Sequence, residues 1–123
     1  MSDRTVRGIR GATTVDSDTP DQIRHATREL LETIVARNGL TSGDVISAIF
    51  TVTHDLTSDF PAHAARELGW LDVPLLCTLE IPVPGSLPRC IRVLLHVASG
   101  ATRAEIRHVY LHSARALRPD LPD

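Results

Sequence analysis

Lysine is absent from this 123-residue chain, in which all 13 basic residues are arginine. Its absence excludes catalysis through a lysine Schiff base and phosphate binding by a Walker-type lysine. Arginine is the better residue for a bidentate grip on carboxylates, because its planar guanidinium presents paired N–H donors. A biased genome composition explains the surface arginines equally well, so only arginines inside apolar segments carry an argument about function.

Aromatic residues, cysteines and long apolar runs are also scarce. Aromatics make up 3% of the chain and the net charge is −2, which disfavours nucleic acid and acidic membranes as partners. The two cysteines, Cys77 and Cys90, form neither a disulfide framework nor a zinc spacing. No segment approaches the ~18 apolar residues of a membrane span. Since the start, MSDRTVRG, lacks an apolar targeting core, we expect a cytoplasmic protein.

The chain length suits one domain over residues 1–123, with residues 113–123 as a C-terminal tail that is a candidate for mobility. Alternating and β-branched segments predict strands at residues 6–15, 45–53, 75–83, 90–99 and 107–111. Helical spacing predicts helices at residues 20–37 and 57–69. The order β-α-β-α-β-β-β predicts an α+β fold, a mixed sheet with helices packed on one face.

Large polar side chains interrupt four of the predicted strands. In CIRVLLHV, Arg92 shares a face with Cys90, Leu94 and His96 by two-residue alternation. We expect this strand to be buried, and a buried guanidinium is costly unless an anion satisfies it. Glu80, from the preceding strand, could be that anion in a structural ion pair. Alternatively, Arg92 and Arg10 with Glu80 and Tyr110 could bind a compact dianion that carries a hydroxyl group.

Other catalytic arrangements find no support in the sequence. His108 and His112 are four residues apart, but a strand there would not place them as a helical metal pair. No Gly-x-Ser-x-Gly motif occurs, and Gly8 and Gly11 do not make a dinucleotide fingerprint. Cys77 has no evident histidine partner, so a packed thiol explains it better. We therefore expect no metal and no organic cofactor.

Four segments together resemble the monofunctional chorismate mutases of the small trimeric class. These segments are RGIRGATTV, FPAHAARELGW, CIRVLLHV and IRHVYLHSARALRPDL, and they cover nearly the whole chain in the right order. The resemblance implies a homotrimer with a pseudo-α/β-barrel core and active sites in clefts between subunits. It also implies the rearrangement of chorismate to prephenate, on the shikimate route to phenylalanine and tyrosine.

The resemblance implies a role for each residue that matches the family pattern. Arg92 would lie beside the breaking ether oxygen and a carboxylate, Arg10 would hold a carboxylate, and Tyr110 would assist. Glu80 and Cys77 would meet the region of the ring hydroxyl. Strict alternation places these two on opposite faces, so both reach one ligand in the same subunit only if the strand twists or ends between them.

The remaining matches lie at the periphery of the implied site. Arg66 matches a basic residue at the cleft mouth, and Arg118 lies in the tail that can close over the site. His63 departs from the pattern, because some relatives carry lysine there. The wall positions are Phe60, Leu76 and Leu117.

Two further functions stay open on the residues alone. One is a trimeric small-molecule deaminase of similar architecture, although RHVYL and RGIRGATT do not look like the motifs of that group. The other is a non-catalytic trimer that binds a cyclic dicarboxylate, since binding and catalysis would use the same groups. A small sheet with exposed edges favours oligomerisation in either case.

Overall fold

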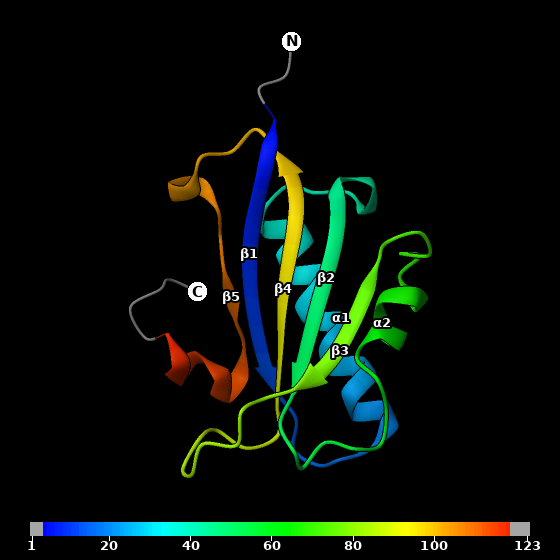
Figure 1. The fold of residues 1–123 in the computed structure, drawn as a ribbon, viewed down its shortest axis with the longest axis vertical. Helices are drawn as coiled ribbons and strands as arrows, with labels where there is room; N and C mark the ends of the chain where they lie inside the picture. Colours follow the sequence, from blue (N-terminus) through cyan, green and yellow to red (C-terminus); the bar gives the residue numbers. More distant parts are fainter. Residues whose placement is uncertain (1–3, 119–123) are drawn as a thin grey trace.

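The computed structural model describes residues 4–118, which form a single mixed sheet flanked by helices (Figure 1). The strands of this part of the chain are β1 (Thr5–Thr14), β2 (Val45–Val52), β3 (Leu75–Leu79), β4 (Cys90–Ser99) and β5 (Val109–Tyr110). The α-helices are α1 (Pro20–Arg37) and α2 (Ala62–Glu67). Short 3-10 helices are η1 (Ser42–Asp44), η2 (Arg103–Glu105) and η3 (His112–Leu117).

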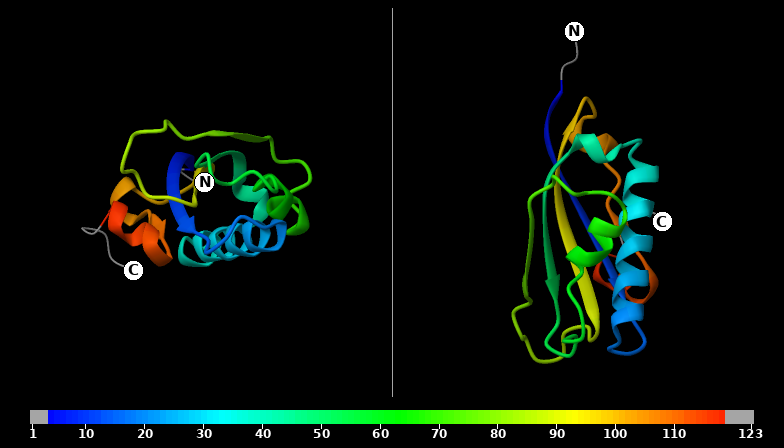
Figure 2. Two further views of the ribbon diagram at one scale, coloured as in Figure 1. Left: turned by 90° about the horizontal axis from the view of Figure 1, so that it is seen from below. Right: turned by 90° about the vertical axis from the view of Figure 1, so that its right-hand side faces the viewer.

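The strand order in the sheet is β3-β2-β4-β1-β5. Strand β4 is antiparallel to both β1 and β2, whereas β3 runs parallel to β2 and β5 runs parallel to β1. Both α-helices lie against one face of the sheet, and the opposite face, called here the open face, has no α-helix over it (Figure 2). The predicted mixed sheet with helices on one face is therefore confirmed.

A close approach of α1 to β1 builds the main core. Gly11 in β1 lies under this helix, and a Cβ there would be 2.7 Å from Ile34 Cδ1 and 3.1 Å from Leu30 Cδ1. Only a residue without a side chain permits this contact. Around it, fully buried residues include Phe50 from β2 and Leu95 from β4. The helix-covered face of the sheet is thus the hydrophobic one.

Helix α1 begins and ends where the sequence predicts. The hydroxyl of Thr19 accepts a hydrogen bond from the backbone N–H of Gln22 at 3.2 Å, and Pro20 occupies the first helical position. After Arg37 the chain turns at Gly39, whose φ of 61° is the left-handed conformation that favours glycine. These caps orient the helix across the sheet.

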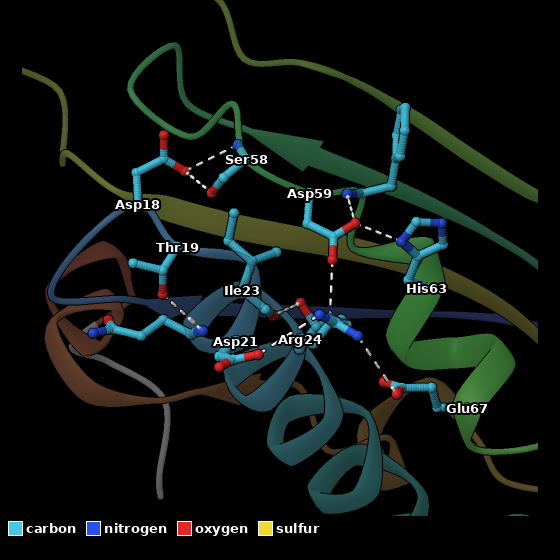
Figure 3. Close-up of polar contacts among 12 residues, drawn as sticks. Asp18, Thr19, Asp21, Ile23, Arg24, Ser58, Asp59, His63 and Glu67 are labelled. Carbon is cyan, nitrogen blue, oxygen red and sulfur yellow. Dashed lines mark hydrogen bonds and ion pairs between the residues drawn. The ribbon is translucent and has the colours of Figure 1, made fainter.

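The second helix is shorter than predicted, because residues 57–61 form a loop. Asp18 accepts hydrogen bonds from the backbone and hydroxyl groups of both Thr57 and Ser58, at 2.5–3.1 Å, and holds them outside the helix (Figure 3). Pro61 disfavours a helical conformation at the preceding Phe60. The helix therefore begins only at Ala62, and this loop is fixed to the start of α1.

The third strand also ends earlier than predicted. Its partner β2 stops at Val52, and only the hydrogen bond from Glu80 N to Val52 O, at 2.9 Å, extends the pairing beyond Leu79. Pro82 cannot donate to a ladder, and the chain leaves the sheet. Ile81 and Val83 are consequently exposed, at 80% and 59%.

The C-terminal region is partly ordered into helix. Strand β5 is confirmed, although only two residues long, and the capping box between Thr102 and Glu105 is present. Residues 113–117, which belong to the predicted tail, lie in η3, while residues 119–123 fall outside the described part of the chain. Among residues 4–118, no helix has the length and apolar character needed to cross a membrane.

Candidate functional site

Four of the predicted site residues line one cavity of about 270 Å³ on the open face. Arg10 comes from β1, Glu80 follows β3, and Arg92 and Tyr110 come from β4 and β5. The register explains why they meet, since Ala12 of β1 is the partner of both Arg92 and Tyr110. Further lining residues include Ile49, Thr51 and Leu94.

Arg92 and Glu80 form a loose ion pair within this cavity. The Nε of Arg92 lies 3.5 Å from Oε2 of Glu80, and the side chains are 45% and 21% exposed. The expectation that Arg92 is buried is therefore wrong for the single chain. Strand β4 buries the alternate residues facing the helices and turns Arg92 toward the open face. The hydroxyl of Thr51 donates to Oε2 of Glu80 and orients the carboxylate.

Histidine 108 supports Arg10 without adding a second acid. The backbone N–H of Arg10 donates to Nδ1 of His108 at 3.0 Å, so this nitrogen carries no proton. Burial, followed by the charges of Arg10 and Arg118, lowers the pKa of His108. The ring is consequently neutral at pH 7. Positive charge from Arg10 and Arg92 therefore exceeds the negative charge of Glu80, and the cavity favours an anionic ligand.

The tail lies at one end of the same cavity. Leu117 and Tyr110 pack against a buried cluster formed by Ala12, Cys90 and Ala114. Burial raises the pKa of the Cys90 thiol, with the neighbouring Arg92 acting in the opposite direction. A protonated, buried thiol is a packing group and not a nucleophile. Leu117 is thus near the predicted site.

Three other predicted residues lie away from this cavity. Cys77 is paired with Phe50 on the helix-covered face and packs against the main core. Its thiol pKa is raised by burial, although Arg66 of α2 is close enough to oppose that shift. Phe60, in the loop before α2, is 62% exposed. Since β3 neither twists nor ends between Cys77 and Glu80, one chain presents them on opposite sides of the sheet.

Exposed apolar residues border the open face near β3. This strand is an edge of the sheet, with β2 on one side only. Leu76 alternates onto the open face beside Ile49 and is 60% exposed. The neighbouring exposed side chains are Leu71, Leu79, Ile81 and Val83. An apolar strip along an unpaired edge indicates a contact surface for another protein.

The largest cavity, about 750 Å³, lies elsewhere, between α1, the end of β1 and η3. Its lining includes Asp16, Asp21 and Glu29, together with His25 and His112. Three carboxylates disfavour a dianion, so the smaller cavity with two arginines is the better candidate for an anionic substrate. Within residues 4–118, no group of three or more His, Cys, Asp or Glu side chains could hold a metal ion.

Sequence reasoning missed Thr51 and the supporting role of His108. Thr51 belongs to VISAIFTVT, and alternation places it on the same face as Ile49. Its bond to Glu80 depends on β2 and β3 being neighbours, which no local pattern reveals. His108 stands within the quoted RHVYL segment, but its partner is a backbone N–H, which carries no sequence signal.

Comparisons with known proteins agree on one family. The family pattern described as chorismate mutase type I matches residues 6–121. A chorismate mutase AroH from Thermus thermophilus is 57% identical over 117 residues, which cover 94% of this chain and 96% of that protein. A second, from Bacillus subtilis (strain 168), is 47% identical over 117 residues, with coverage of 94% and 92%. The fold matches a chorismate mutase from Clostridium thermocellum with a TM-score of 0.89 and 50% identity, covering 89% of this chain and 98% of that one.

Proposed function

Because the chain belongs to the type I chorismate mutase family and is a chorismate mutase, we propose that its active site forms between copies of the chain. The cavity of Arg10, Glu80, Arg92 and Tyr110 supplies one half. The observation that carries the proposal is the surplus of positive charge in this cavity, beside a carboxylate and a phenol. The deaminase and the non-catalytic binder find no support in the comparisons.

The reaction asks little of the protein in covalent terms. In the rearrangement of chorismate to prephenate, the ether C–O bond breaks while a new C–C bond forms within the same molecule. No proton, nucleophile or external electron has to be supplied. The protein has to hold the compact conformer and stabilise the charge that develops in the transition state. We therefore propose that no metal or cofactor takes part.

Arg92 is the group proposed to stabilise the ether oxygen. Negative charge grows on this oxygen as the C–O bond breaks, and a preorganised guanidinium stabilises it without the reorganisation that water requires. The pair with Glu80 at 3.5 Å supports this role, because it holds Arg92 near the cavity without tightly neutralising it. Glu80, oriented by Thr51, would accept a hydrogen bond from the ring hydroxyl.

Arg10 and Tyr110 are proposed to bind substrate carboxylate groups. Their strands are direct neighbours, with β5 parallel to β1. Neutral His108 supports the backbone of Arg10 and leaves the guanidinium as the charged group there. Arg118 and Leu117, at the end of the described chain, are proposed to close over the ligand.

The second half of the site would come from a neighbouring copy. Phe60, Arg66 and Cys77 lie around α2 and β3, remote from the cavity of their own chain. Leu76 and the exposed apolar strip at the β3 edge offer a surface for subunit contact. We propose a homotrimer in which the open faces form a pseudo-α/β-barrel core. A cytoplasmic location stays a prediction, consistent with two unpaired thiols.

Subunit mixing tests the divided site. Arg92→Ala removes one half and Arg66→Ala the other, and each variant alone should turn over chorismate poorly when its ultraviolet absorbance is followed. Joint refolding of equal amounts should restore about one quarter of the sites, because a site works when each half comes from an intact subunit. Failure to restore activity, with a trimer mass by light scattering, would place the whole site within one chain.

A further inference from the structure

Asp59 is a nearly buried carboxylate that joins three parts of the chain. Its side chain is 9% exposed. Oδ1 accepts hydrogen bonds from the backbone N–H of Phe60 at 2.7 Å and from Nδ1 of His63 at 2.5 Å. Oδ2 pairs with Nε of Arg24 at 3.0 Å. Figure 3 shows Asp59 between His63 of α2 and Arg24 of α1.

This contact determines which nitrogen of His63 carries a proton. An ionised carboxylate only accepts hydrogen bonds, so Nδ1 of His63 must be the donor. In the neutral imidazole, Nε2 then carries a lone pair and repels a carboxylate. In the imidazolium, Nε2 becomes an N–H donor and attracts one. The side chain is 45% exposed, with its ring edge 5.6 Å from the Phe60 ring centre at an interplanar angle of 77°.

The charged groups around this pair leave Asp59 as the direct partner of the imidazole. Arg24 faces it from α1 and is shared with Asp21 at 3.6 Å and Glu67 at 4.0 Å. Glu67 and Arg66 belong to the same short helix as His63. Arg24 thereby holds the carboxylate of Asp59 from behind and keeps its other oxygen turned toward His63.

We propose that Asp59 is a positioning residue that makes His63 a proton-dependent contact for a carboxylate of chorismate. The inference rests on the proposed interfacial site, in which Phe60 and His63 stand at the cleft mouth. The open-face cavity of the neighbouring copy contains Arg92, where the chemical step takes place. His63 therefore acts on substrate capture and leaves the rearrangement itself unchanged.

The expected consequence is a Michaelis constant that depends on pH. Histidine side chains titrate between about pH 5 and 8. As the imidazolium loses its proton, KM should rise about three- to fivefold, the effect of one partly exposed ion pair. The value of kcat should stay constant over the same range. His63→Lys should hold KM low throughout, and His63→Gln should hold it high throughout.

Asp59→Asn separates positioning from a purely structural role. Arg24 requires an oxygen on its side, so the amide NH₂ turns toward His63 and Nδ1 becomes the acceptor. The neutral ring then carries its proton on Nε2 and donates at every pH. The rise of KM with pH should therefore diminish, and ¹⁵N NMR should show His63 changing from the Nδ1–H to the Nε2–H tautomer.

The control is His25→Gln, which removes an exposed histidine of α1 and should leave the pH profile unchanged. Wild-type protein that turns over chorismate with a pH-independent KM would overturn the inference, as would a neutral Nε2–H tautomer in the wild type. Wild-type protein with no turnover at any pH would instead contradict the proposed function. The NMR readout does not depend on activity and tests the Asp59 contact by itself.

Discussion

Citrulline at position 92 keeps the shape of the arginine side chain and removes its charge. If about half a unit of negative charge develops on the ether oxygen ~3 Å away, the guanidinium contributes roughly 3 kcal/mol at an effective dielectric constant near 20. That is about a hundredfold in kcat. Because Arg92 is 45% exposed and its ion pair with Glu80 is 3.5 Å long, its loss should change the free energy of unfolding by less than ~1 kcal/mol.

The assay follows the fall in chorismate absorbance under saturating conditions, together with thermal unfolding of the same samples. Arg28→Gln is a matched control, since Arg28 pairs with Glu32 at 3.8 Å and is 50% exposed. This control should lose a similar, small amount of stability and no activity. A citrulline variant with near-parental kcat would refute electrostatic stabilisation and leave conformer selection as the source of catalysis. A large drop in melting temperature with unchanged turnover would support a structural ion pair.

Three further results are expected. Asp18→Ala should lower the melting temperature at neutral pH and weaken its acid dependence; donors in the loop lower the pKa of Asp18 from 3.8, so its contribution is present above that value and lost as the pH falls through the folded value. Gly11→Ala should destabilise by roughly 1–3 kcal/mol in denaturant titrations, because the added methyl meets Ile34. Exhaustive chelation should leave turnover unchanged; a loss restored by one metal would contradict the proposed mechanism.

Local patterns predicted most of the fold, and non-local contacts account for the errors. The caps of α1 and the alternation of β1 and β4 are properties of consecutive residues, and their bounds agree with the prediction to within one residue. The second helix was predicted too long because Asp18, far away in sequence, holds the preceding loop. The third strand was predicted too long because its length depends on where β2 ends.

The site divides in the same way. Alternation identified Arg10 and Arg92 as polar residues on strands, and sheet register brings them to one cavity with Glu80 and Tyr110. Their joint assignment to one ligand came from the family resemblance, since periodicity carries no information about which strands are neighbours. Cys77 shows the limit, because its face follows from alternation but its proposed partner belongs to another copy.

The pairing of β5 with β1 has a consequence for the timing of folding. The hydrogen bond from Arg10 to His108 spans 98 residues, and Tyr110, the only tyrosine of the chain, enters the cavity through the same pairing. Closing so long a loop is entropically costly and slow, so this end of the sheet should form late in refolding. Partly folded chains therefore lack the cavity. A ligand that binds there stabilises only the completed fold, in proportion to the logarithm of its concentration.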